Sequence, residues 1–519
     1  MPFPPLSRRR FLSASALASL SLAARPLFSL DQPAPITVDS PSGPLAGSQL
    51  SGIRVFRGVP FAEPPVGPLR FRPPVPIKPW TAPRDATRPA PAAMQPGGDS
   101  TNHSEDCLYL NIWAPAGDGP FPVYVWIHGG GFTAGSANDP RTDGSVLAAR
   151  GMVAVSVAYR LGAFGFLDLE PLLGPAYAGS ANNGLRDLIA ALEWIHHNIA
   201  AFGGDPERVT IGGESAGAKL TCILMGTPSA RPLFSQMISE SGGAERVAPR
   251  ELSLKVAENF AESWRKITGS APGAAASAPA AQLIDVQQQF IASYSMHFPL
   301  RCQIDGTLLP RLPVETILAG SSRGKRLLIG TNRDESAAFI GPHPEKDPTA
   351  ADLGNLPLAA FNEVFAKYPA VYPSMSAEQL RIRAVTAEEY WIPTTRVTGA
   401  HLAGGGSAYA YRLDFAETSG RLRGYAFHAL DVPLVWNRPH PDVANASTEA
   451  MLARQMHDAW VAFLERGAPS AVGLPNWTAY DTAHRWTMTL NTQESPQGTI
   501  NRVESNPQEA ELRLWDGLL

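Results

Sequence analysis

The sequence predicts an α/β fold, with a mostly parallel central sheet and helices on both faces. Continuous apolar runs, such as 121–127 and 151–157, are typical of parallel strands that are buried on both sides. A segment with helical periodicity, 184–202, follows them. Further apolar runs occur at 237–239, 327–329 and 408–411. Strands that alternate with helices along the chain favour this layered arrangement.

The first thirty residues have the three-part pattern of an export signal. Ser7-Arg-Arg-Arg-Phe-Leu12 resembles the twin-arginine motif, and the uncharged run that follows, Phe11 to Ala24, is too short to span a membrane. We therefore expect a twin-arginine signal peptide over residues 1–30, cleaved between Ala24 and Pro35, and a periplasmic or secreted protein. A disordered basic N-terminus is the alternative. No stable membrane insertion is expected after the signal is removed.

Residues 31–519 are predicted to form one domain, because α/β folds often hold a single large core in a long chain. The glycine- and proline-rich stretch 36–75 contains short β-type pieces and predicts an antiparallel flap. Two regions look like insertions: a low-complexity segment, 269–281, predicts a surface loop, and 340–404 predicts part of a cap. The last predicted elements are an amphipathic helix at 451–466 and a strand at 486–490.

Composition excludes several classes of function. The formal charge of −4, which removal of four arginines with the signal would change to −8, gives no reason to expect nucleic acid or an anionic membrane as a partner. The histidines and cysteines show no metal-binding spacing, so neither a metal nor another cofactor is predicted. The cysteines are few for an exported protein, which suits folding in a reducing cytoplasm before export: Cys107, Cys222 and Cys302. The oligomeric state is left open.

Ser215 lies at a predicted bend between a strand and a helix. The β-type run 209–211 ends at a pair of glycines, and 216–225 has the pattern of a helix. Gly213-Glu-Ser-Ala-Gly217 fits G-x-S-x-G, a tight turn that lifts a serine oxygen clear of the sheet. Side chains at either glycine would collide with neighbouring backbone. The helix would direct its free N–H groups at the hydroxyl, where negative charge develops during acyl transfer.

Six motifs occur in order along the chain: Phe56-Arg-Gly-Val-Pro-Phe-Ala-Glu-Pro-Pro65, Ser104-Glu-Asp-Cys-Leu-Tyr-Leu-Asn111, His128-Gly-Gly-Gly-Phe132, Phe202-Gly-Gly-Asp-Pro206, Gly213-Glu-Ser-Ala-Gly217 and Ser239-Glu-Ser-Gly242. Together they resemble the type B carboxylesterase family, the α/β-hydrolases that include cholinesterases and bacterial p-nitrobenzyl esterases. The resemblance spans roughly residues 35–490. It implies an α/β-hydrolase fold and hydrolysis of small-molecule carboxylic esters through an acyl-enzyme on Ser215.

The resemblance also implies an acid and a base that would activate this serine. In α/β-hydrolases the nucleophile is followed in the chain by Asp or Glu and then by His. Asn332-Arg-Asp-Glu-Ser336 resembles the family's acid motif and implies Glu335, which the sequence alone does not separate from Asp334. A solvated loop carboxylate is the alternative. The stretch from His428 to Trp436 resembles the family's H-x-x-E-x-x-x-V-F and implies His428 as the base.

Further roles are implied by the same resemblance. The H-G-G-G loop of esterases is matched at 128–131, so the backbone N–H groups of Gly130, Gly131 and Ala216 would hold the oxyanion, with a plain flexible turn as the alternative. Glu214 would order the turn around the nucleophile. Ser241 would support the acid or the histidine, unless it is an ordinary strand-end serine.

The sequence departs from the family at Cys107. The family's cysteine in this motif usually pairs with one upstream, but none precedes Cys107 and Met94 stands about where the partner would be. We expect no disulfide and a buried thiol. Phe132 and Trp391 are candidate pocket aromatics, with core packing as the alternative for Trp391.

Two rival functions remain. The first is a non-catalytic binding protein, as in adhesion proteins of this family that have lost the serine, although all three triad positions are occupied here. The second is a lipase that acts on longer-chain acyl esters, although no large apolar lid is evident. The motifs predict the reaction and leave the acyl and alcohol parts of the ester open.

Overall fold

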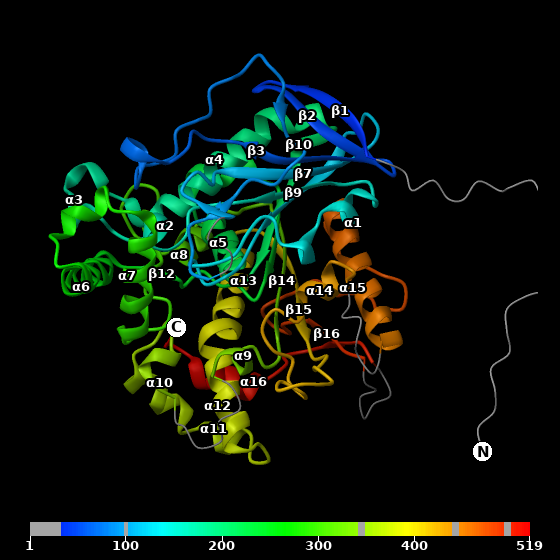
Figure 1. Ribbon diagram of the computed structural model, residues 1–519. Coiled ribbons are helices and arrows are strands. Elements are labelled where there is room, and N and C mark those ends of the chain that lie inside the picture. The colour runs from blue at the N-terminus through cyan, green and yellow to red at the C-terminus, as the bar shows by residue number, and fades with distance from the viewer. Residues whose placement is uncertain (1–32, 98–101, 341–347, 439–445, 493–499, 519) are drawn as a thin grey trace, which may run out of the picture.

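The structure, a computed structural model, describes residues 33–97, 102–340, 348–438, 446–492 and 500–518 (Figure 1). Its centre is one large sheet. In order across it lie β1 (Ala34–Ser40), β2 (Gly43–Leu50), β3 (Ile53–Pro60), β7 (Tyr109–Pro115), β9 (Val153–Val157), β8 (Phe121–Ile127), β10 (Gly204–Glu214), β11 (Gln236–Glu240), β14 (Arg326–Asn332), β15 (Ser407–Leu413), β16 (Thr487–Leu490) and β17 (Arg502–Glu504), with β4 (Arg84–Asp85) beside β2. Two small sheets pair β5 (Ala92–Ala93) with β6 (His103–Ser104), and β12 (Val247–Ala248) with β13 (Cys302–Gln303).

The middle of the large sheet is parallel and its margins are antiparallel. Every pairing from β9 through β8, β10, β11, β14 and β15 to β16 is parallel. The predicted antiparallel flap is present as β1, β2 and β3, which continue the sheet through β7. The predicted fold class is therefore confirmed. In such a sheet, loops at the carboxyl ends of the parallel strands form the usual place for a site.

The strand β8 shows why continuous apolar runs predicted this sheet. Val123, Val125 and Ile127 belong to one hydrophobic cluster, whereas Tyr124 and Trp126 belong to another on the opposite face. Because side chains alternate along a strand, burial on both faces requires an apolar residue at every position.

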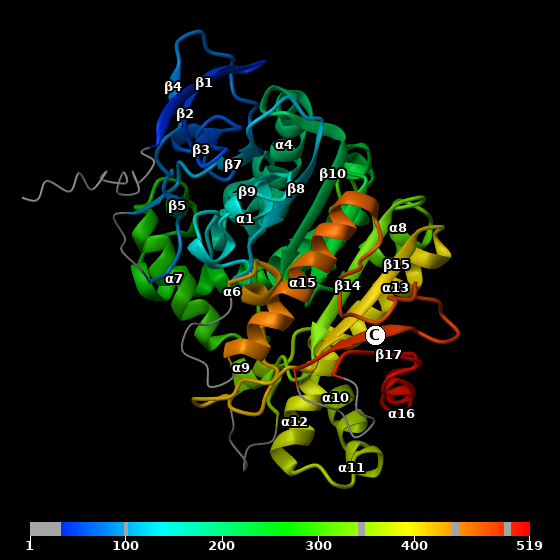
Figure 2. The same cartoon turned by 90° about the vertical axis from the view of Figure 1, so that its right-hand side faces the viewer.

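Helices cover both faces. The first cluster includes α2 (Gly162–Phe166), α4 (Asn183–Asn198), α5 (Ala216–Met225), α6 (Arg250–Thr268) and α7 (Ala280–Ser293), together with α8 (Pro313–Leu318) and α13 (Ile392–Ala403). The second includes α1 (Ser145–Ala148), α14 (Val432–Val435) and α15 (Ala446–Arg466). Figure 2 shows α15 crossing one face of the sheet. A short helix, α3 (Glu170–Leu173), lies beside α6.

Two sequence predictions need correction in detail. The helix predicted over 184–202 ends as α4 at Asn198 and continues as a 3₁₀ turn, Ile199–Phe202. The predicted loop 269–281 contains a 3₁₀ turn, Pro272–Ala276, and the first residues of α7. Alanine-rich composition accounts for both helical pieces, since alanine is the strongest helix former.

The region predicted as a cap divides into two parts. The helices α10 (Leu358–Phe365), α11 (Tyr368–Val371) and α12 (Ala377–Thr386) share a third hydrophobic cluster with Trp515, which follows α16 (Glu509–Leu512). Figures 1 and 2 both show these helices gathered at one end of the molecule. By contrast, α13 packs against α8, β14 and β15 and belongs to the main helical layer. Between α12 and α13 the chain forms a π-helix, Ala387–Trp391.

The three cysteines are buried and unpaired. Burial raises the pKa of the Cys222 thiol to about 11 and moves the pKa of Cys107 and of Cys302 upward as well. The expected free thiol at Cys107 is therefore present. The predicted signal, residues 1–30, lies outside the described residues. Among the helices that the structure describes, none has the length and apolar character needed to cross a membrane.

Candidate active site

Ser215 sits at the sharp turn between β10 and α5, as the sequence predicts. Its backbone has φ 56° and ψ −121°, a conformation that a non-glycine residue adopts only under constraint. A Cβ atom placed on Gly213 or Gly217 would lie 2.2 Å or 1.9 Å from the carbonyl oxygen of Ile127. Both positions therefore require glycine, and the neighbouring strand β8 holds the turn in place.

The carboxylate of Glu335 is fully buried on the loop after β14. Its Oε1 accepts hydrogen bonds from the backbone N–H of Asn332 at 2.7 Å and from Ser241 Oγ. Its Oε2 lies 2.6 Å from Nδ1 of His428. Asp334, its neighbour in sequence, turns away, pairs with Arg333 and accepts from the backbone N–H of Ala426 at 3.0 Å. The structure thus brings Glu335, and not Asp334, to the histidine.

His428 lies between two carboxylates. Its backbone N–H donates to the carbonyl of Glu335 at 3.2 Å, which joins the two loops. On the other side of the ring, Nε2 lies 3.1 Å from Oε1 of Glu214, but the two atoms are not aligned for a hydrogen bond. Burial alone would lower the pKa of His428, but the negative charges of Glu214 and Glu335 outweigh it and raise that pKa to about 9.

Glu214 makes a contact that sequence reasoning missed. It was expected to order the turn, yet its side chain faces the imidazole of His428 from the position directly before Ser215. Burial raises the pKa of Glu214 to about 8, with the nearby His428 opposing that rise. Only the folded chain reveals this contact, because more than two hundred residues separate Glu214 from His428.

The glycine loop after β8 approaches the serine turn. A Cβ on Gly129 would lie 3.1 Å from Cβ of Ser215, so the two segments are in direct contact. Among the described residues, the backbone N–H groups of Gly130, Gly131 and Ala216 donate no hydrogen bond to the protein. Ala216 is the first residue of α5, where N–H groups are free by geometry. These three groups are therefore available to an oxygen beside Ser215.

Aromatic side chains surround the histidine, and the sequence did not identify them. The rings of Phe339 and Tyr390 lie 5.0 Å and 4.8 Å from that of His428, and Phe339 remains 46% exposed. The ring of Phe298 lies against Gly131. Of the two aromatics proposed from sequence, Phe132 packs on Phe166 in the core, and Trp391 packs over Arg383.

A buried charged cluster lies behind this site. Nζ of Lys219, one helical turn after Ser215, is 3.0 Å from both the backbone oxygen and Oε1 of Glu389 and stands 4.7 Å over the ring of Tyr390. Arg246 pairs with the same carboxylate and stacks over Phe298. The cluster thereby joins α5, the π-helix and the aromatic wall. No group of His, Cys, Asp and Glu in the described part of the chain could hold a metal ion.

Comparison with known proteins agrees with this geometry. The family model described as "Carboxylesterase family" matches residues 34–515. The chain is 34% identical over 475 residues to the para-nitrobenzyl esterase of Bacillus subtilis (strain 168), covering 87% of this chain and 94% of that protein. It is 32% identical over 462 residues to the fumonisin B1 esterase of Sphingopyxis macrogoltabida, covering 85% and 84% respectively.

A solved structure shows the same fold. The carboxylesterase EST55 of Geobacillus stearothermophilus superposes with a TM-score of 0.81 at 34% identity, covering 92% of this chain and 100% of that one. The chain therefore belongs to the carboxylesterase family and is a serine-dependent carboxylic ester hydrolase with the α/β-hydrolase fold.

Proposed function

We propose that Ser215 is the nucleophile, His428 the general base and Glu335 the acid that orients it. The observation that carries this assignment is the position of His428: Nδ1 contacts the buried Glu335, and Nε2 points to the segment that carries Ser215. Serine needs a base within reach, and the base needs a partner that fixes its tautomer. With its proton on Nδ1, the imidazole presents the lone pair of Nε2 to the serine side.

The proposed reaction has two halves. Ser215 Oγ attacks the ester carbonyl carbon while its proton moves to Nε2 of His428. The tetrahedral intermediate collapses, the C–O bond to the alcohol breaks, and the alcohol leaves with the proton from His428. Water then attacks the acyl-serine, again losing a proton to Nε2, and the carboxylic acid is released as Ser215 recovers its proton.

The oxyanion of each intermediate would be held by the backbone N–H groups of Gly130, Gly131 and Ala216. Their freedom from internal hydrogen bonds and their position beside Ser215 support this role. Ser241 would hold Glu335 in place by donating to the oxygen that His428 does not use.

The substrates we propose are small carboxylic esters with an apolar or aromatic part. The partly exposed ring of Phe339 next to His428 supports this class, since it offers an apolar surface beside the reacting carbonyl. One relative, the para-nitrobenzyl esterase, is named for an ester with an aromatic group, which supports the same class. Longer-chain acyl esters are the second candidate. A panel of p-nitrophenyl esters of increasing acyl length separates the two, and rising kcat/KM beyond eight carbons would favour the second.

Labelling with a fluorophosphonate tests the nucleophile. The wild-type protein should gain one adduct by intact mass, and Ser215→Ala should gain none. Ser239→Ala, a buried serine on the neighbouring strand, serves as the control and should label as wild type does. An adduct on the Ser215→Ala protein would overturn the assignment.

We also propose that the protein is exported, because Arg8 and Arg9 lie in a twin-arginine pattern ahead of a short apolar run. The remaining residues, 31–519, would act as one domain outside the cytoplasm. Replacing both arginines with lysine should abolish the processed form in the periplasmic or culture fraction. Equal amounts of processed protein from both versions would contradict export by this route.

A further inference from the structure

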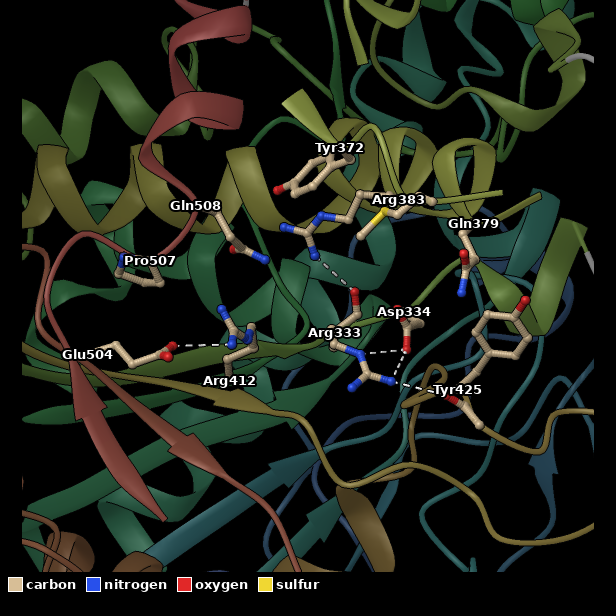
Figure 3. Close-up of a pocket in the computed structure, with 12 residues that line it drawn as sticks. Arg333, Asp334, Tyr372, Gln379, Arg383, Arg412, Tyr425, Glu504, Pro507 and Gln508 are labelled. Carbon is tan, nitrogen blue, oxygen red and sulfur yellow. Dashed lines mark hydrogen bonds and ion pairs between the residues drawn. The ribbon is translucent and has the colours of Figure 1, made fainter. Parts of the chain in front are cut away.

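A cavity lies behind the loops that carry the proposed acid and base, apart from the proposed active site, and we call it the second cavity. It has a volume of about 550 Å³, within the range of small-molecule sites. Ser215 is not among its lining residues, which are Arg333, Asp334, Tyr372, Met375, Gln379, Arg383, Arg412, Gly424, Tyr425, Glu504, Pro507 and Gln508. Figure 3 shows Arg412 from the sheet, Arg383 from α12 and Gln508 from the segment before α16 pointing toward one another.

One wall of this cavity is the reverse side of the active site. Arg333 and Asp334 directly precede Glu335 in the chain. Arg333 donates to the carbonyl of Gly424 at 3.0 Å, and Asp334 exchanges backbone and side-chain hydrogen bonds with Ala426, two residues before His428. A molecule in the cavity would therefore contact the hydrogen-bonded residues that join the loop of Glu335 to the loop of His428.

Three arginines line the cavity, together with the carboxylates of Asp334 and Glu504. Arg383 and Arg412 are both mostly buried and are held by carboxylates, Arg383 by Glu511 and Arg412 by Asp414 and by Glu504, which also lines the cavity. These contacts fix the planes of the two guanidinium groups. In Figure 3, one terminal nitrogen of Arg412 points across the hollow toward Arg383 and Gln508. The forks of both arginines are occupied by these contacts, and in Arg412 only Nη1 has no hydrogen bond within the described residues. A rigidly held N–H of this kind suits an oxygen of a carboxylate.

Gln508 gives a second sign that the cavity is a binding site. Its backbone has φ 62°, a left-handed conformation, and its buried Oε1 has no hydrogen-bond partner in the described part of the protein. Figure 3 shows the amide turned into the hollow between the two guanidinium groups. A buried polar atom without a partner is costly and is satisfied when a ligand or water supplies one. Tyr372, Met375 and Tyr425 add apolar surface to the lining.

We propose that this cavity is a second binding site for a small aromatic carboxylate. The carboxylate would accept a hydrogen bond from Nη1 of Arg412, a water held beside it would donate to Oε1 of Gln508, and the ring would lie along Tyr372. Carboxylates are also what ester hydrolysis releases, so the ligand comes either from the protein's own turnover or from solution. The site is separate from the catalytic serine and does not depend on the assignment of Ser215.

The test uses 4-fluorobenzoate, followed by ¹⁹F line broadening, on full-length protein whose active site has first been blocked with a fluorophosphonate. Binding with a Kd of about 1 mM or tighter is expected for a ligand of ten non-hydrogen atoms. The uncharged 4-fluorobenzamide should bind at least tenfold more weakly. Absence of saturable broadening, or equal binding of the amide, would overturn the proposal.

Two variants keep the test specific to the cavity. Gln508→Glu and Gln379→Glu keep the side-chain shape and add a negative charge to the lining of the cavity, and glutamate at 379 retains the capping box with Ser376. Each should weaken 4-fluorobenzoate binding at least tenfold. Gln288→Glu, on the exposed face of α7, adds the same charge elsewhere and should bind as wild type does. Wild-type binding by both cavity variants would overturn the proposal.

A last arm identifies the source of the ligand. Unblocked protein is given phenyl 4-fluorobenzoate, so that the carboxylate forms within the protein. A bound signal that precedes accumulation of free carboxylate supports the site as a receiver of product. A bound signal that follows the bulk concentration supports it as a site for carboxylate from solution. If no bound signal appears in either arm, the proposal is overturned.

Discussion

Nε2 of His428 lies 3.1 Å from Oε1 of Glu214, the residue that directly precedes the proposed nucleophile. The pKa of each group is raised, that of His428 to about 9 and that of Glu214 to about 8. Burial raises the pKa of Glu214, whereas the negative charges of Glu214 and Glu335 raise that of His428 and favour its protonated form. Near neutral pH, His428 of the free enzyme therefore holds a proton. It must lose this proton before it can accept one from serine.

Replacing Glu214 with Gln should shift the acid limb of the kcat/KM profile to lower pH. The wild-type limb should lie on the alkaline side of neutrality, since His428 becomes neutral only as pH rises through its raised pKa. Removing the facing charge lowers that pKa by about 1–3 units. Rates on one soluble ester from pH 5 to 10 measure the shift. Glu193→Gln, an exposed change on α4, is the control, and a limb that stays in place in Glu214→Gln would contradict the interpretation.

Glu335→Gln should cost far more activity than Asp334→Asn. Glutamine keeps the shape but removes the charge that stabilises the imidazolium, and its amide favours the wrong tautomer of His428. The analogous change in a serine protease lowers the rate by up to ~10⁴-fold, about 5 kcal/mol. Asp334 instead pairs with Arg333 and supports the backbone at Ala426. Steady-state kcat/KM of both variants on the same ester decides between them. The reverse order of losses would move the acid to Asp334.

Phe339→Ala should raise KM for aromatic esters and leave small aliphatic esters nearly unchanged. Its ring is partly exposed 5.0 Å from that of His428, so it is placed to contact the substrate. An aromatic contact contributes about 0.5–1.5 kcal/mol, which corresponds to about a 2- to 12-fold change in KM. Phe365→Ala, in the third hydrophobic cluster, controls for loss of a ring elsewhere. Equal effects on phenyl acetate and ethyl acetate would argue against a substrate contact.

Lys219→Met should destabilise the protein by about 1–3 kcal/mol, because the buried carbonyl and carboxylate oxygens of Glu389 lose a donor. Arg246 still pairs with that carboxylate, which limits the loss. The measurement is the urea midpoint at fixed protein concentration. Lys255→Met removes a solvent-exposed pair with Glu251 and should change little. Equal midpoints for wild type and Lys219→Met would show that the buried cluster does not stabilise the fold.

Residue patterns predicted the framework of this protein better than its inner contacts. Apolar runs and helical periodicity suffice for β8, β10 and α5, because each depends on local sequence and burial. The turn at Ser215 was also predictable, since glycine is the only residue type that fits at positions 213 and 217. The choice of Glu335 over Asp334 needed the family resemblance, because both carboxylates follow the same strand.

Contacts between distant segments could not be predicted in this way. Tyr390, which the sequence did not single out, lies beside His428 from the π-helix. Trp391 packs over Arg383, as its core-packing alternative predicts. The second cavity combines residues from the acid loop, α12, β15 and the C-terminal segment, and no periodicity marks such a combination.

The three sulfur atoms offer a way to observe the molecule opening. Cys107, Cys222 and Cys302 lie at separate points of the interior with thiols that stay protonated at neutral pH. A maleimide in solution can reach each thiol only when the surrounding structure exposes it. The three alkylation rates therefore measure local and global unfolding. Cys222 lies on α5, which begins directly after Ser215, so its alkylation rate would report local unfolding next to the proposed nucleophile without any engineered cysteine.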